Sequence, residues 1–300
     1  MHDHEPGNAA AARQEASGLY GKKLAFYGAG SMAEAIVRGL LTRELTQPQQ
    51  ITMINRADAA RLEALRSRYG VQAPSEGGAK LEALKGAEIV VLAMKPKDAA
   101  QALRQFGEIV RPGQLLVSVI AGLRIAAIER LVGRDVPIVR TMPNTSSTIG
   151  LGVTGISFSE RVSPQARAMA TAMFEAVGTA EVVDEPLLDA VTAVSGSGPA
   201  YAYYLMEQMI AAGQQLGLDA DAARALTVQT LRGAAEMVLA TGEQPAELRR
   251  KVMSPGGTTE AAIRTLDAHG FPEGVQRAMA RAAERAGELG DSIEEGLQSS

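Results

Sequence analysis

The sequence predicts an α/β protein with an N-terminal doubly wound sheet followed by an all-α C-terminal domain. From Lys22 onward, short apolar segments alternate with segments of helical periodicity, the order that gives parallel strands covered by helices on both faces. The pattern changes at Ser163-Pro164, a serine N-cap followed by proline at the first helical position, and the chain after it is alanine-rich and helical. We therefore expect a disordered extension at 1–20, a sheet domain at 21–160 and a helical domain at 161–300.

The elements follow from length and periodicity. Apolar runs of five or six residues indicate buried strands, and longer amphipathic segments indicate helices. The expected strands are KLAFYG, ITMIN, IVVLAM, LLVSVI and IVRTM, at 23–28, 51–55, 89–94, 115–120 and 138–142. The expected helices between them include 32–41, 61–70 and 98–110; those of the second domain are 164–177, 185–194, 199–216, 219–240, 245–253, 258–268 and 272–289.

Composition excludes several classes of function. The net charge of −4 argues against a nucleic-acid binder, and no apolar run reaches the roughly 20 residues that cross a bilayer. The chain has no cysteine and three histidines, which excludes disulfides and thiolate sites and argues against histidine triads and zinc sites. Residues 1–20 lack the cationic start and apolar core of a secretory signal. We expect a cytoplasmic protein without nucleic-acid, membrane or metal partners.

The helix at 199–216 is apolar nearly all round and carries one charge, Glu207. Such a helix must be buried over most of its circumference, and a domain of this size can hardly enclose it together with the helix at 219–240. The sequence therefore predicts a homo-oligomer, a dimer or a multiple of dimers, whose interface is built from these helices. The alternative is that both are central helices of a monomer.

A glycine-rich turn joins the first strand to the first helix of the sheet domain. Gly28-Ala29-Gly30-Ser31-Met32-Ala33 fits the fingerprint G-x-G-x-x-A of Rossmann-type dinucleotide sites. Gly28 allows the tight turn, Gly30 lets the backbone approach a pyrophosphate, and Ala33 lets helix pack on strand. The helix N-terminus supplies amide donors and a favourable dipole.

The second strand ends in Asn55-Arg56, where an NAD site usually places an acidic residue for the ribose 2′-hydroxyl. Arg56 can pair with a 2′-phosphate in a forked geometry. The sequence therefore favours NADP, and NADPH over NADH. The alternative for Arg56 is a solvated loop residue.

A second candidate anion site lies near the C-terminus. Ser254-Pro255-Gly256-Gly257-Thr258-Thr259 precedes a helix, and its glycines allow a concave turn whose amides can bind a carboxylate. An ordinary connector with a threonine cap is the alternative. Ser195-Gly196-Ser197-Gly198-Pro199 is another glycine turn that opens a helix, and a hinge would have the same sequence.

Taken together, these motifs resemble pyrroline-5-carboxylate reductases. The resemblance covers about residues 22–288 and rests on the glycine turn, Ala93-Met94-Lys95-Pro96, Met142-Pro143-Asn144-Thr145, Ser195 to Tyr201 and Ser254 to Thr259. It implies reduction of 1-pyrroline-5-carboxylate to L-proline with NAD(P)H, the last step of proline biosynthesis, by an assembly of interlocked helical domains.

The resemblance also implies roles for single residues. The pyrophosphate would lie on Gly28, Gly30, Ser31, Met32 and Ala33, the adenosine ribose or its phosphate on Asn55 and Arg56, and the nicotinamide half on Met94, Lys95 and Ala121. The substrate carboxylate would bind Ser254, Thr258 and Thr259 around Gly257, with Thr259 as the catalytic residue near the imine nitrogen. Lys251 and Ser146-Ser147 depart from the commonest family pattern, which puts the substrate contact at Lys251 in doubt.

Two other functions fit parts of the sequence. A β-hydroxyacid dehydrogenase usually carries a catalytic lysine in the first helix of its second domain, and the segments 164–177 and 185–194 contain no lysine. A dinucleotide sensor without chemistry would not need a second anion-binding turn.

Overall fold

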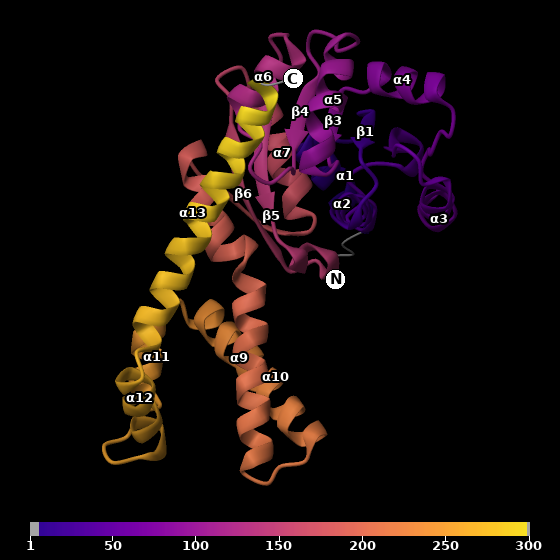
Figure 1. The fold of residues 1–300 in the computed structure, drawn as a ribbon. Coiled ribbons are helices and arrows are strands. Elements are labelled where there is room, and N and C mark those ends of the chain that lie inside the picture. Colours follow the sequence, from indigo (N-terminus) through magenta and orange to yellow (C-terminus); the bar gives the residue numbers. More distant parts are fainter. Residues whose placement is uncertain (1–5, 299–300) are drawn as a thin grey trace. The chain divides into compact units, whose positions relative to one another are not determined.

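The computed structural model describes residues 6–298 (Figure 1). The chain forms two compact units. The sheet unit runs to Gly196 and takes up the chain again from Ala282, and the helical unit consists of Ser197–Arg281.

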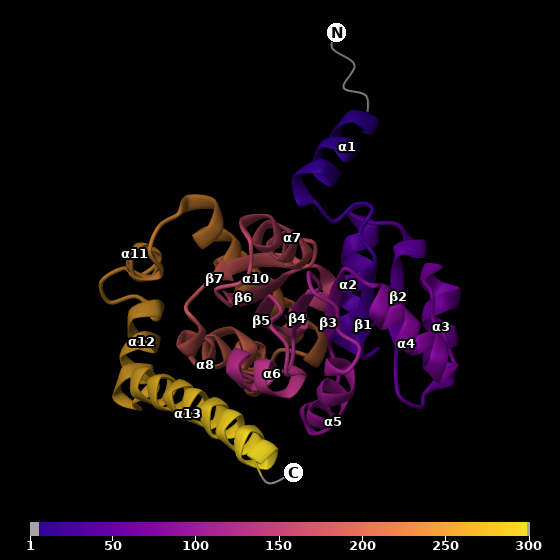
Figure 2. The ribbon, with the colours of Figure 1, turned by 90° about the horizontal axis from the view of Figure 1, so that it is seen from above.

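The sheet unit is built on seven strands in the order β2-β1-β3-β4-β5-β6-β7 (Figure 2). Strands β1 to β5 pair in parallel, β6 is antiparallel to β5, and β7 is parallel to β6. The strands are β1 Leu24–Tyr27, β2 Ile51–Ile54, β3 Ile89–Leu92, β4 Leu115–Ser118, β5 Ile138–Pro143, β6 Gly152–Phe158 and β7 Gly178–Val182. All four residues of β3 and of β4 are buried, as expected of central strands covered on both faces.

Helices bury one apolar cluster on each face of the sheet. The first cluster takes Ile36 and Leu40 from α2 and Phe174 from α7, whereas the second takes Leu103 from α5 and Ile128 from α6. The helices of this unit are α1 Pro6–Ser17, α2 Ser31–Thr42, α3 Ala59–Tyr69, α4 Gly77–Gly86, α5 Pro96–Gly107, α6 Ile125–Val132, α7 Pro164–Glu175 and α8 Leu188–Val191. The doubly wound arrangement confirms the predicted fold class of the N-terminal region.

The helical unit contains α9 Gly198–Gln215, α10 Ala220–Thr241, α11 Pro245–Lys251, α12 Thr258–Ala268 and the first part of α13 Phe271–Gln298. Helices α9 and α10 pack against each other, and they meet closely where a Cβ on Gly213 would lie 3.2 Å from the Cβ of Ala223. Within residues 6–298 no helix is both long and apolar enough to cross a membrane.

The structure corrects two boundaries. The sheet continues beyond residue 160 through α7 and β7, so the units divide after Gly196. The missed strands β6 and β7 include Gly152, Gly155 and Gly178, which weaken a strand pattern. Near the N-terminus, where we expected disorder at 1–20, Pro6–Ser17 forms α1, as an alanine-rich segment readily does; residues 1–5 lie outside the described part of the chain.

Candidate active site

The glycine turn after β1 lies between the ends of the two neighbouring strands. Gly28 has φ of +123°, and its amide donates to the Ile54 carbonyl at the end of β2, at 2.8 Å. A Cβ on Gly28 would lie 2.3 Å from the carbonyl atoms of Ala93, just after β3. Only glycine fits this position. The connection after β1 runs to β2 on one side of the sheet, whereas the connection after its neighbour β3 runs to β4 on the other side, so the crevice between β1 and β3 is the switch point where α/β sheets bind ligands.

The turn presents open backbone to a ligand. A Cβ on Gly30 would meet no atom within 4 Å, and Gly30 is the N-cap of α2. The Glu34 amide donates to the Gly30 carbonyl at 3.0 Å, so the preceding amides of Ser31, Met32 and Ala33 have no acceptor within the helix. Ser31 is exposed, whereas Met32 is partly buried against the core and Ala33 is fully buried. The residues present therefore fit a pyrophosphate.

A cluster of ion pairs and hydrogen bonds holds the glycine turn, Gly28–Ala33, against α3. Arg61 of α3 donates from Nε to the Ala29 carbonyl at 3.0 Å and from Nη2 to Glu34 at 2.5 Å. Glu34 also accepts from Arg68 at 3.0 Å and from Tyr69 at 2.8 Å. Burial by itself raises the pKa of Glu34, but hydrogen bonds and charge from its partners outweigh burial and hold that pKa below its ordinary value. The turn is thereby braced against α3.

The residues after β2 are already engaged with neighbours. The Asn55 amide group donates to the Asp58 carbonyl at 2.7 Å and accepts from the Asp58 amide at 3.1 Å, which shapes the start of α3. Arg56 pairs with Asp98 of α5 at 3.2 Å and has 83% of its side chain exposed. A ligand phosphate would compete with Asp98 for an accessible guanidinium.

Two further loops reach the same edge of the sheet. Met94 is partly buried against the second apolar cluster, and Lys95 is an exposed N-cap of α5. Ala121 is exposed in the loop after β4, next to Gly122, which has φ of +77°. Within this unit, the structure brings the cofactor-binding residues expected from the sequence to the carboxyl ends of β1 to β4.

The second candidate anion site, the Ser254–Thr259 turn, belongs to the helical unit. Gly256 has φ of +72°, and the Gly257 amide donates to the Ser254 carbonyl at 2.9 Å. A Cβ on Gly257 would lie 2.4 Å from the Ser254 Oγ and 3.0 Å from the Ser254 carbonyl oxygen, so a side chain there would displace the Ser254 hydroxyl. Gly257 is the N-cap of α12, without a side-chain cap, and the first amides of that helix belong to Thr258 and Thr259. The local geometry fits a small carboxylate.

Lys251 and Ser195, which the sequence singles out, both contact other residues of the chain. Lys251 pairs with Glu243 at 2.5 Å. Ser195 lies in a π-helical stretch, Thr192–Gly196, and its carbonyl accepts from the Asn144 side chain at 3.2 Å. The Asn144 Oδ1 accepts the Val153 amide at 3.3 Å. Asn144 thus ties this stretch to β5 and β6.

Comparisons with known proteins show the family of this chain. Residues 185–289 match the family model described as pyrroline-5-carboxylate reductase dimerisation, and residues 23–122 match one described as NADP oxidoreductase, coenzyme F420-dependent. Pyrroline-5-carboxylate reductase 2 of Bacillus subtilis (strain 168) is 42% identical over 268 residues, 89% of this chain and 95% of the relative. The chain belongs to the pyrroline-5-carboxylate reductase family.

Solved structures of the family agree with the fold. The pyrroline-5-carboxylate reductase from Coxiella burnetii superposes with a TM-score of 0.83 at 35% identity, covering 89% of this chain and 98% of that one. The Plasmodium falciparum enzyme, solved with NADP bound, has a TM-score of 0.79 at 27% identity and covers 90% and 98%. A doubly wound domain followed by a mostly helical region is thus confirmed.

Sequence reasoning missed several residues that shape the pyrroline-5-carboxylate reductase motifs. Arg61 contacts Ala29 within the glycine turn, and Asp98 pairs with Arg56. Glu260 accepts the Gly256 amide at 2.6 Å and pairs with Arg264 at 2.7 Å. An acid in the first helical turn is a recognisable signal for Glu260. Arg61 and Asp98 give no local signal, because the partners of their side chains are 27 to 42 residues away in the sequence.

Proposed function

We propose that this chain reduces 1-pyrroline-5-carboxylate to L-proline with hydride from NADPH, the last step of proline biosynthesis. The observation that carries the proposal is the 42% identity to a pyrroline-5-carboxylate reductase over 89% of the chain. The local geometry of the glycine turn and of the Ser254–Thr259 turn supports it, because each fits one of the two anions that the reaction brings together.

The sheet unit binds the dinucleotide in this proposal. The pyrophosphate lies on the backbone at Gly28 and Gly30 and on the first amides of α2, and Met94, Lys95 and Ala121 line the nicotinamide half. When bound, the reduced nicotinamide supplies the hydride. Arg56 and the absence of an acid at the end of β2 favour NADPH over NADH. Since Arg56 is exposed and already pairs with Asp98, we expect this preference to be modest, about tenfold.

The Ser254–Thr259 turn holds the substrate carboxylate. Ser254, Thr258 and Thr259 donate hydrogen bonds to the carboxylate, and the Thr259 hydroxyl orients the ring nitrogen. Threonine is too weak an acid to protonate an imine, so the substrate binds as its iminium or takes a proton from water. Hydride adds to the imine carbon, and the C=N electron pair moves to the nitrogen. The rate enhancement then comes mainly from alignment.

We further propose that the enzyme is a homodimer or a multiple of dimers in the cytoplasm. The match of residues 185–289 to a dimerisation model supports the dimer. So does the apolar surface of α9 and α10, on which Tyr204 is 66% and Leu239 is 78% exposed in the single chain. Apolar side chains of this size are normally covered in an assembly.

The deciding experiment follows NADPH oxidation at 340 nm with 1-pyrroline-5-carboxylate, beside NADH, and identifies the product by chromatography. We expect L-proline in amounts equal to the NADPH consumed. In the matched variant Arg56→Ala, the ratio of NADPH to NADH efficiency should fall toward one. Cofactor binding without turnover of 1-pyrroline-5-carboxylate would overturn the proposed reaction and favour a dinucleotide sensor.

A further inference from the structure

The loop that follows β4 is in direct backbone contact with the C-terminal part of α13. Gly122 lies in this loop and Gly290 on the helix. A Cβ on Gly122 would lie 3.3 Å from the Gly290 amide nitrogen, and a Cβ on Gly290 would lie 3.1 Å from the Gly122 carbonyl oxygen. Two glycines therefore let loop and helix approach more closely than side chains would allow.

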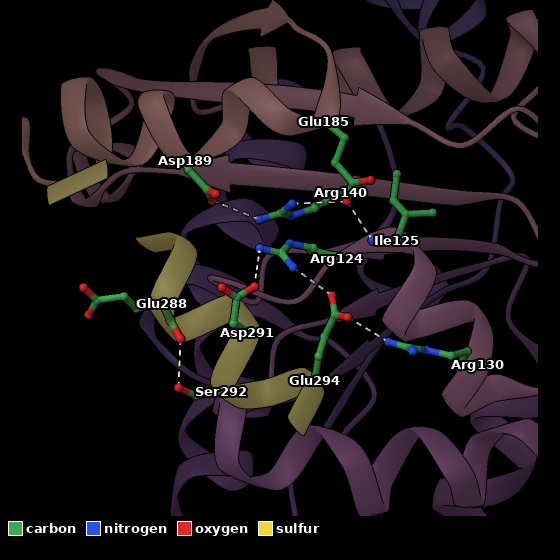
Figure 3. A network of polar contacts seen from close by, with 10 residues as sticks. All are labelled: Arg124, Ile125, Arg130, Arg140, Glu185, Asp189, Glu288, Asp291, Ser292 and Glu294. Atoms are coloured by element: carbon green, nitrogen blue, oxygen red, sulfur yellow. Dashed lines mark hydrogen bonds and ion pairs between the residues drawn. The ribbon is translucent and has the colours of Figure 1, made fainter. Parts of the chain in front are cut away.

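Arg124 stabilises this contact between the loop and α13 with two ion pairs. Its Nη2 is 2.8 Å from Asp291 and its Nη1 is 3.1 Å from Glu294, both on α13 (Figure 3). Glu294 also pairs with Arg130 of α6 at 2.9 Å. The side chains of Arg124 and Glu294 are 35% and 23% exposed, whereas those of Asp291 and Arg130 are 62% and 53% exposed, so water screens the Arg124–Glu294 pair least.

A second network of polar contacts holds the end of this loop at Ile125, where α6 begins. The Ile125 amide, in the first turn of α6, donates to Glu185 at 2.7 Å. Glu185 pairs at 3.2 Å with Arg140, whose side chain is 6% exposed, and Arg140 lies 3.7 Å from Asp189 (Figure 3). The segment from Ala121 to Ile125 is thus held by α13 at Gly122 and Arg124, and by Glu185 at Ile125. Glu185 is itself held by the buried Arg140.

We propose that Arg124 is a positioning residue: through Asp291 and Glu294 of α13, it holds the Ala121–Gly122 backbone in the place where the nicotinamide half of the cofactor binds. The inference rests on the proposed function, which puts Ala121 against the nicotinamide. Arg124 is the N-cap of α6, only three residues from Ala121, so its anchoring limits how far the loop can move. Hydride transfer is sensitive to displacements of this kind, since a shift of about 1 Å can cost about a hundredfold in rate.

The test compares Arg124→Gln with Arg161→Gln. Arg161 forms an equally short ion pair with Asp135 at 2.8 Å in the same unit and serves as the matched control. We expect Arg124→Gln to lower kcat with 1-pyrroline-5-carboxylate about tenfold and to change the Kd for NADPH less than about threefold, because the phosphate contacts lie elsewhere. Hydrogen exchange of the amides at 119–124 should accelerate without any ligand, while exchange in β1 and β3 stays at the wild-type rate.

Gly290→Val provides a second, uncharged perturbation. Its side chain would push α13 away from Gly122 and should reproduce both the lower kcat and the faster local exchange. The proposal is overturned if the wild type is active and Arg124→Gln keeps its kcat within about twofold, or if exchange accelerates equally throughout the sheet unit, as a purely structural role requires. A wild type without turnover of 1-pyrroline-5-carboxylate contradicts the proposed reaction instead, and the exchange measurement still tests the anchoring.

Discussion

The two units differ in how far they bury their apolar side chains within the single chain. In the sheet unit, Phe26, Phe106 and Phe174 are fully buried within the single chain. In the helical unit, α9, α11 and α12 contain no buried residue, and α10 buries only Ala223 and Thr227. The sheet unit therefore carries its own core, whereas the helical unit leaves many of its apolar side chains exposed in the single chain. If the helical unit is completed by a partner in the proposed dimer, mutations in the sheet unit should affect folding and cofactor binding, whereas mutations on α9 and α10 should affect dimer formation.

The largest effect is expected at Gly28, inside the self-contained unit. Gly28→Val places a β-branched side chain at φ of +123° and 2.3 Å from the Ala93 backbone. We expect a loss of about 3 kcal/mol or more in the free energy of unfolding, measured by urea denaturation, and no NADPH binding. Gly30→Ala is the control, since its Cβ meets open space: it should keep the stability and weaken only NADPH binding. Equal stability of the two variants would contradict the packing described here.

Thr259 tests chemistry in the helical unit without a change in the fold. Thr259→Ala should lower kcat about 10- to 1,000-fold, the range for losing one oriented donor. Thr259→Ser, which keeps the hydroxyl, should recover most of the rate. Steady-state kinetics with saturating NADPH, together with melting temperatures that match the wild type, would make the comparison clean. Unchanged kinetics for the alanine variant would remove Thr259 from the mechanism.

Leu239 tests the dependence of the helical unit on a partner. Leu239→Asp puts a charge on a side chain that is 78% exposed in the single chain but buried in the proposed dimer. A two-fold interface carries the change twice, so the loss of about 1 kcal/mol of apolar contact in each subunit raises the dimer dissociation constant about thirtyfold. Light scattering across a dilution series should show this shift, while Leu81→Asp, on an exposed face of α4, should not. An unchanged dissociation constant for Leu239→Asp would place the interface elsewhere.

The smallest effect concerns pH and returns to the sheet unit. The pKa of Glu34 is depressed in the folded state, so its ion pairs stabilise the fold above the ordinary carboxyl value of about 4.5 and lose that contribution as pH falls below it. Glu34→Gln should cost about 1.5 kcal/mol at pH 7, and the difference should disappear in strong acid. Glu82→Gln, which breaks an exposed pair with Lys85, should change little at any pH. A pH-independent loss for Glu34→Gln would show that packing, not charge, accounts for it.

Local sequence patterns predict those elements whose structure depends on neighbouring residues, but not the strands and contacts that depend on residues far apart in the sequence. Strands β1 to β5, the fold class and the glycine turns follow from apolar runs and backbone freedom. Strands β6 and β7 escaped prediction because they contain glycines and because their structure depends on pairing, of β6 with β5 and of β7 with β6. The ion pair of Arg56 with Asp98 likewise joins residues far apart in the sequence and leaves no local signal. The roles of the site residues remain predictions for the variants above.

In the proposed reaction, the Ser254–Thr259 turn binds the substrate carboxylate and so positions the imine for hydride transfer. The most direct measurement compares kcat/KM for 1-pyrroline-5-carboxylate with that for 1-pyrroline, which has the same imine but no carboxylate, at saturating NADPH. We predict at least a hundredfold loss without the carboxylate, because the binding energy that aligns the imine is then missing. Equal efficiencies for the two imines would contradict the account.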